Sequence, residues 1–166
     1  WRAMHLLARD RQPIAVYGPT SSELTDTIIP RFEQHLDALR WTYRPAGLLR
    51  PQIRIAGMPR ILFRSMERPE RIVGYQVAHA LVDEWDLARD PLLARERIHG
   101  RVRLRLPEGR PNTVAFFGTP EGFGALHRIF VRENRDGERR LIQAPTWSNP
   151  YVTRAFLERL CSTYPE

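Results

Sequence analysis

The chain has 166 residues, which suits one domain over residues 1–166 with a sizeable buried core. The sequence has one cysteine and five scattered histidines, which excludes a disulfide framework and a multi-cysteine zinc site. It has no signal peptide and no apolar run of the roughly 20 residues that a membrane span needs, so we expect a soluble intracellular protein. All 26 basic residues are arginine, and the net charge of +7 favours phosphate-bearing partners, although a GC-rich genome would explain the missing lysine equally well.

The N-terminal segment predicts the second half of a βαβ unit. Residues 1–11 have helical spacing with no capping residue before them, and a short apolar strand, Ile14–Tyr17, follows. The missing half would be a strand and a glycine-rich phosphate loop, so we expect that loop to precede Trp1. A phosphate loop of the G-x-x-x-x-G-K-[ST] type needs a lysine, and the sequence contains none.

The next segment predicts a helix and a hairpin. The helix is expected to begin at Ser21 or Ser22, to be kinked at Pro30 and to end near Arg40. After a connection rich in proline and glycine, two apolar runs flank a Gly-Met-Pro turn and predict a hairpin, at residues 53–55 and 61–64.

An apolar run that ends in two carboxylates is the most informative feature. The run Val77–Val82 is typical of a buried parallel strand, and Asp83 and Glu84 follow it directly. Ligands bind at the carboxyl ends of such strands, where an acid of a nucleotide hydrolase holds Mg²⁺ and a second group orients the attacking water. Asp83 suits the first role and Glu84 the second, although an acidic turn can also end a strand without any chemistry.

The segment after the acids predicts a basic helix face. Asp90 and Pro91 are a typical helix start, and the apolar spacing extends the helix to Leu106. The alternation in residues 101–106 would also fit a strand. On such a helix Arg97, Arg101 and Arg105 would lie above one another, at intervals of four residues. This row of like charges would either bind an anion such as DNA phosphate or form a solvated basic face.

The remainder continues the alternation of strands and helices. A buried strand is predicted at residues 113–117, and Thr119 then lies on the same edge as the acids. The other predicted elements are a helix at 125–132, a turn at 136–137, a strand at 140–144 and a helix from Asn149 to about Cys161. The pattern predicts an α/β fold with a mostly parallel sheet flanked by helices.

Taken in order, these motifs resemble the ATPase domain of the large terminase subunit of tailed double-stranded DNA bacteriophages. The resemblance covers nearly the whole chain and rests on Tyr17-Gly18-Pro19-Thr20, Arg64-Ser65, Gly74, Leu81-Val82-Asp83-Glu84, Phe117-Gly118-Thr119-Pro120-Glu121-Gly122-Phe123, Ala144-Pro145-Thr146 and Ser148-Asn149-Pro150-Tyr151. It implies a RecA-like phosphate-loop NTPase core of the additional-strand (ASCE) type, incomplete at its N-terminus. The chain would then be a fragment, or the ordered part of a larger protein, and it lacks the phosphate loop and the nuclease domain of the family.

The resemblance also implies an activity and partners. The protein would hydrolyse ATP with Mg²⁺ and translocate viral double-stranded DNA into the procapsid. It would work in the host cytoplasm as a homo-oligomeric ring, with the portal protein and the small terminase subunit as partners and no membrane. This fragment alone would hydrolyse ATP negligibly.

Individual roles follow from the matched motifs. Asp83 would be the Walker B metal ligand, Glu84 the catalytic glutamate, Thr119 and Pro120 the coupling motif, and Arg71 the nearest candidate for an arginine finger that acts on a neighbour's nucleotide. Two alternatives remain open: a helicase-type nucleic-acid-dependent ATPase, and a non-enzymatic DNA-binding or capsid-associated module. A G-K-[ST] loop upstream of Trp1 in the genomic reading frame would favour an enzyme.

Overall fold

A computed structural model describes residues 2–47, 49–119, 122–134 and 139–163. The chain divides into two compact units, Trp1–Arg128 and Ile129–Glu166, where the sequence predicts one domain. We call them unit 1 and unit 2.

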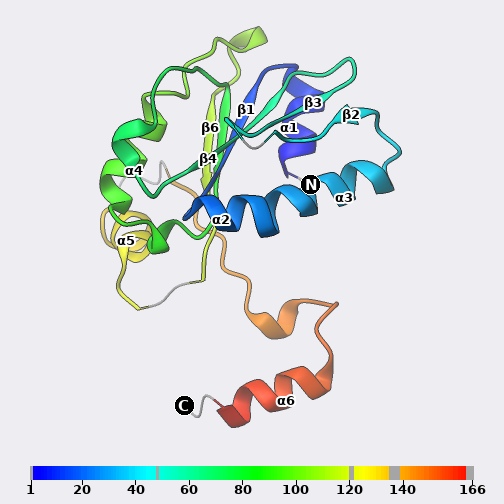
Figure 1. Cartoon of the computed structure of the whole chain (residues 1–166). Helices are drawn as coiled ribbons and strands as arrows, with labels where there is room; N and C mark the ends of the chain where they lie inside the picture. Colours follow the sequence, from blue (N-terminus) through cyan, green and yellow to red (C-terminus); the bar gives the residue numbers. More distant parts are fainter. Residues whose placement is uncertain (1, 48, 120–121, 135–138, 164–166) are drawn as a thin grey trace. The chain divides into compact units, whose positions relative to one another are not determined.

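Unit 1 contains a six-stranded mixed sheet of order β2-β3-β4-β1-β5-β6 (Figure 1). The strands β4, β1, β5 and β6 run parallel, with β6 at one edge of the sheet, and β3 and β2 extend the other side with antiparallel pairing. The strands are β1 (Ile14–Gly18), β2 (Tyr43–Arg44), β3 (Gln52–Ile55), β4 (Ile61–Ser65), β5 (His79–Val82) and β6 (Thr113–Phe116). The predicted α/β class, the β3–β4 hairpin and the parallel strands β1, β5 and β6 are therefore confirmed. The prediction that the last of them is buried is wrong, because β6 lies at the edge of the sheet and its four residues are only half-buried.

Helices connect the strands. The α-helices are α1 (Arg2–Asp10), α2 (Ser21–Glu23), α3 (Ile29–Ala38), α4 (Pro91–His99), α5 (Ala125–His127) and α6 (Arg154–Thr163). Two π-helical segments are η1 (Leu24–Ile28) and η5 (Arg128–Arg132), and four 3₁₀ turns are η2 (Pro69–Arg71), η3 (Trp85–Leu87), η4 (Pro107–Gly109) and η6 (Thr146–Ser148). Among the described residues, no helix is long and apolar enough to cross a membrane.

The core of unit 1 lies mainly between the sheet and two helices. Side chains alternate between the two faces of a strand, and Val16, Phe63 and Leu81 form one buried cluster with residues of α1 and α3. On the opposite face Trp85 packs against Phe116, with ring centroids 4.5 Å apart. The sheet is thus covered on both sides, as parallel strands require.

The predicted helix at residues 21–40 is interrupted. Its N-cap is Thr20 rather than a serine, because the Thr20 side chain accepts the N–H of Glu23 at 3.1 Å. Pro30 has no N–H for the α-helical bond to the preceding turn, and the π-helical segment η1 lies just before it, closed by a bond from the Ile29 N–H to the Leu24 carbonyl.

The prediction of one helix from Asp90 to Leu106 is wrong beyond His99. The Asp90 cap is confirmed, since its side chain accepts the N–H of Leu93 at 2.9 Å. After Gly100 the chain becomes extended, and Val102 forms a parallel bridge with Val77. Pairing with the segment before β5 replaces helical bonds, so the arginines at 97, 101 and 105 do not stack on one helix face.

Unit 2 also differs from its prediction. No strand forms at residues 140–144, which make no ladder within the part of the chain that the structure describes. Helix α6 begins at Arg154, where the Thr153 hydroxyl accepts the Phe156 N–H at 3.3 Å, rather than at Asn149. The predicted turn at 136–137 lies outside the described residues.

Candidate functional site

The carboxyl ends of the four parallel strands lie along one edge of the sheet. The register pairs Gly18 with Ser65, Tyr17 with Val82, and Val82 with Phe116. We call this edge the carboxyl edge. Because ligands of parallel sheets bind at such edges, the residues directly after each strand are the candidate site.

Asp83 and Glu84 lie at this edge, as the sequence predicts. The Asp83 N–H donates to the Tyr17 carbonyl at 2.9 Å, which holds the residue in the sheet. Burial raises the pKa of the Asp83 carboxyl, and the negative charge of Glu23 raises it further. A cation beside Asp83 would relieve this cost, so the environment of the carboxyl fits a metal ligand.

Glu84 has a left-handed backbone, with φ 43° and ψ 53°. This conformation costs a non-glycine residue about 1–2 kcal/mol. Strained residues persist where the surrounding structure holds them, and they are frequent at functional sites. Here Trp85, which follows Glu84, is fully buried and donates its indole N–H to the Pro91 carbonyl at 2.8 Å.

The loop after β6 contacts Glu84 directly. The Thr119 N–H donates to Glu84 Oε2 at 3.3 Å, and a Cβ on Gly118 would lie 3.4 Å from the same oxygen and 3.1 Å from Leu126 Cδ1. The structure therefore brings together Asp83, Glu84 and Thr119, three of the predicted site residues. Pro120, the fourth member of this group, lies outside the described residues.

Asp86 forms a second contact with the segment after β6, and the sequence analysis did not predict this role for it. Asp86 Oδ1 accepts the Leu126 N–H at 2.9 Å, and a Cβ on Gly124 would lie only 2.8 Å from Asp86 Oδ2. The only signals in the sequence were a third acid close to the pair and a glycine-rich segment that ends at Gly124, 38 residues further along. Together these contacts join the turn after β5 to the loop after β6.

Arg71 lies apart from the acids. It is exposed in η2 and lines a cavity of about 940 Å³ beside the ends of β1 and β4, and neither Asp83 nor Glu84 lines that cavity. Its action as a finger on a neighbour's nucleotide stays a prediction.

The three arginines of the predicted basic face occupy different environments. Arg97 is exposed on α4, and Arg105 is exposed near a second cavity by Pro107. Arg101 is half-buried, and its Nε is buried without a hydrogen-bond partner among the described residues. Their contact with DNA stays a prediction, but the helical row on which it was based does not exist.

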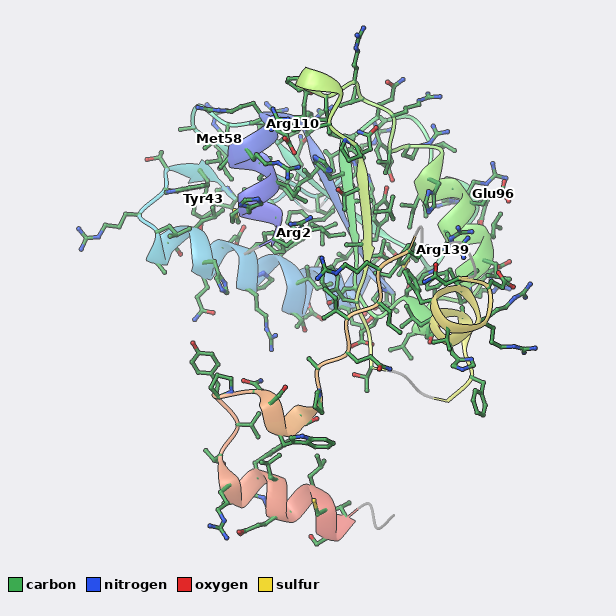
Figure 2. The ribbon with its side chains drawn as sticks, turned by 180° about the vertical axis from the view of Figure 1, so that it is seen from behind. Arg2, Tyr43, Met58, Glu96, Arg110 and Arg139 are labelled. Carbon is green, nitrogen blue, oxygen red and sulfur yellow. The ribbon has the colours of Figure 1, made fainter. Side chains whose placement is uncertain are left out.

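A buried ionic cluster lies at the opposite edge of the sheet, where the parallel strands begin. Asp10 and His79 are both buried, and His79 Nε2 lies 2.8 Å from Asp10 Oδ2. Asp10 also pairs with Arg9 at 2.6 Å and with Arg110, which is labelled in Figure 2, at 2.7 Å. The Thr113 N–H donates to His79 Nδ1 at 3.1 Å, so the neutral ring carries its proton on Nε2 and donates it to Asp10.

The electrostatics of this cluster keep the histidine neutral. Burial lowers the pKa of His79 despite the neighbouring carboxylate. The hydrogen bond from Arg9 lowers the pKa of Asp10, so the carboxylate stays charged. This cluster connects α1, β5 and β6, which makes His79 a core histidine rather than a metal ligand. Over the described residues, no group of three or more His, Cys, Asp or Glu side chains could hold a metal ion.

Comparisons with known proteins match the fold. No protein-family model and no curated protein matches the sequence. The large terminase of a thermophilic bacteriophage matches with a TM-score of 0.78 and 16% identity, over 99% of this chain and 41% of that chain. The ADP complex of the same terminase matches with a TM-score of 0.76 and 17% identity, over 99% of this chain and 40% of that chain. The large terminase ATPase domain of Thermus phage P74-26 matches with a TM-score of 0.54 and 13% identity, over 78% of this chain and 56% of that chain.

The chain has the fold of a phage large terminase ATPase domain. This confirms the resemblance at the level of the fold, including its RecA-like α/β class. The chain spans about two fifths of the length of the thermophilic-phage terminase.

Proposed function

We propose that this chain is part of a DNA-packaging motor ATPase, a large terminase that couples ATP hydrolysis to the translocation of DNA. The hydrogen bond between Thr119 and Glu84 carries the proposal. It connects the candidate catalytic acid to the loop that would transmit movement. The terminase fold and the ADP complex of the thermophilic-phage terminase support it.

Asp83 would hold Mg²⁺ in this proposal. The ion prefers one or two carboxylates and completes its shell with water and phosphate oxygens, so a single half-buried aspartate suits it better than a protein cage. Bound Mg²⁺ would neutralise the charge of the nucleotide phosphates. The raised pKa of Asp83 means that the free carboxylate is disfavoured, which a cation would offset.

Glu84 would orient the attacking water and accept its proton. Its carboxylate accepts the Thr119 N–H at 3.3 Å, so a turn of Glu84 toward a water would break that bond. Release of the loop and activation of water would therefore occur together. Gly118 lies directly beside this carboxylate, because a Cβ there would be in van der Waals contact with Glu84 Oε2 at 3.4 Å.

The partners follow from the same proposal. Double-stranded DNA would be the cargo, and the portal protein and the small terminase subunit would be the protein partners of a homo-oligomeric ring. Arg71 would then act across a subunit boundary, which fits its exposure and its separation from the acids.

Two substitutions in the full-length protein that carries this chain test the proposal. Glu84→Gln keeps the shape of the side chain and removes the charge, so nucleotide binding should persist while phosphate release falls by about 10² to 10⁴. Asp83→Asn should weaken Mg²⁺-dependent nucleotide binding and turnover together. Nucleotide affinity with and without Mg²⁺, and the rate of phosphate release, are the measurements.

Glu96→Gln is the matched control. Glu96 is exposed on α4 and points away from the sheet (Figure 2), so this variant should bind and hydrolyse ATP like the unmodified protein. Hydrolysis at the unmodified rate by Glu84→Gln would refute the catalytic assignment and leave the acids as an ordinary strand end.

A further inference from the structure

The cavity beside β1 and β4 is lined by a dense group of arginines. Its volume is about 940 Å³, within the range of ligand sites. Hydroxyl groups of Thr20, Ser21 and Ser65 also line it. The arginines are Arg50, Arg64, Arg68, Arg71 and Arg89. We call this feature the arginine cavity.

The positive charge of the arginine cavity is largely uncompensated. Five guanidinium groups face one lining carboxylate, Glu67, which leaves a net charge of +4 (five minus one). That carboxylate is already engaged, since it accepts the Ser21 N–H at 3.2 Å, the Ser21 hydroxyl at 2.8 Å and the Ser65 hydroxyl at 3.0 Å. Among the ion pairs between described residues, none includes an arginine of this cavity.

Arg64 is held in position without any anion. Its Nη1 donates to the carbonyls of Pro51 at 3.0 Å and Phe63 at 2.6 Å, and its guanidinium lies 5.1 Å from the centre of the Tyr75 ring. Burial lowers the pKa of Arg64, and the charge of Arg50 lowers it further. A bound anion would relieve both effects, so the cavity is arranged for negative charge before a ligand arrives.

The lining residues favour a nucleic-acid backbone over a free nucleotide. Guanidinium forks suit phosphate oxygens. The three lining hydroxyls already donate to carboxylates of the protein, so the arginines are the phosphate-binding groups. The described lining includes no aromatic side chain on which a base could stack, and such platforms are usual where single strands bind. Four of the five arginines are exposed, which suits contacts spread along successive phosphates of a duplex.

We propose that the arginine cavity binds the phosphodiester backbone of duplex DNA. This rests on the proposed function and deepens it, since it locates a DNA contact on unit 1 that the predicted helical row of arginines does not provide. Asp83 and Glu84 do not line the cavity, so the DNA contact would lie apart from these acids on the carboxyl edge. Arg71 keeps its proposed role toward a neighbour's nucleotide and is not counted as a DNA contact.

A triple variant tests the proposal. Arg50→Gln, Arg68→Gln and Arg89→Gln together remove three exposed charges and leave Arg71 in place. Binding of a fluorescent duplex of arbitrary sequence is measured by anisotropy, without nucleotide, from about 50 to about 200 mM salt. Each phosphate contact contributes about 0.9 to the slope of log affinity against log salt, so the slope should fall by about 2.7 and low-salt affinity by at least about tenfold.

The control removes the same charge elsewhere. Arg40→Gln, Arg44→Gln and Arg54→Gln change three exposed arginines outside the cavity, and this variant should keep the unmodified salt slope. Circular dichroism confirms that both triple variants fold. An unchanged slope in the cavity variant, or an equal loss in both variants, overturns the proposal. So does ADP that displaces the duplex from the cavity.

The assay also separates this proposal from the ATPase proposal. The duplex is bound without nucleotide, so Glu84→Gln should bind it like the unmodified protein. A cavity variant that loses DNA binding while Glu84→Gln still hydrolyses ATP at full rate would support the cavity and refute the catalytic assignment. Normal DNA binding by the cavity variant, with hydrolysis lost in Glu84→Gln, would refute the cavity proposal and support the catalytic assignment.

Discussion

Replacement of His79 by leucine should destabilise unit 1 strongly. His79→Leu introduces an apolar side chain of similar size and removes both ring nitrogens. The Thr113 N–H then loses its acceptor and Asp10 loses one donor. An unsatisfied buried group costs about 1–3 kcal/mol, and Asp10 retains the arginine partners Arg9 and Arg110, so the expected total is about 2–4 kcal/mol. The free energy of unfolding of a whole domain is only about 5–15 kcal/mol, so this loss would be a large part of it.

The pH dependence provides a second readout. The folded pKa of His79 lies below its ordinary value near 6.5, so the unfolded chain takes up the proton first as the pH falls. His79 therefore stabilises the fold fully above about pH 6.5 and progressively less below it. The lowered pKa of Asp10 has the same sign, but its loss begins only below about pH 4, in a separate window.

Urea unfolding at about pH 7.5, 6.5 and 5.5 measures both effects. The unmodified protein should lose stability across this range more steeply than His79→Leu. The control is His5→Leu, because His5 is exposed on α1, and it should change the free energy of unfolding by less than about 0.5 kcal/mol. Equal stability of His79→Leu and the unmodified protein at the highest pH, or equal pH slopes, would refute the reasoning.

Three further substitutions test other parts of the fold. Asp90→Ala removes the acceptor for the Leu93 N–H and should lower the free energy of unfolding by about 1 kcal/mol in urea titrations. Trp85→Ala empties a fully buried site and should cost about 3–5 kcal/mol in the same assay, so near-native stability would contradict its packing role. Gly118→Ala places a Cβ 3.1 Å from Leu126 Cδ1, so the Leu126 side chain must shift, and the free energy of unfolding should fall by about 1 kcal/mol in the same titrations.

Elements with strong local signals were predicted correctly. The apolar runs of β1 and β5 specify buried strands because a parallel sheet buries both faces of its central strands. The run of β6 also specifies a parallel strand, but this strand lies at the edge of the sheet and is only half-buried. The Asp90 cap is equally local, since its acceptor and the capped N–H are three residues apart. The acids after β5 were placed at the carboxyl edge for the same reason, as the end of a strand is visible in its own sequence.

Local signals failed where a distant segment competed. Residues 101–106 carry both helical and alternating spacing, and the bridge between Val102 and Val77 decides between them. The apolar run at residues 140–144 looks like a strand, yet no described strand pairs with it. In each case the sequence offers a conformation, and the availability of a hydrogen-bonding partner determines the outcome.

The sequence alone therefore determined the α/β class, the parallel strands and the position of Asp83 and Glu84 at the carboxyl edge. Only the tertiary structure decided the contacts that give these residues their chemical environment. The Thr119–Glu84 bond joins residues 35 apart, and the His79–Asp10 bond joins residues 69 apart. The physical reason is that side-chain hydrogen bonds across such separations depend on how the strands are ordered in the sheet, which no local periodicity encodes.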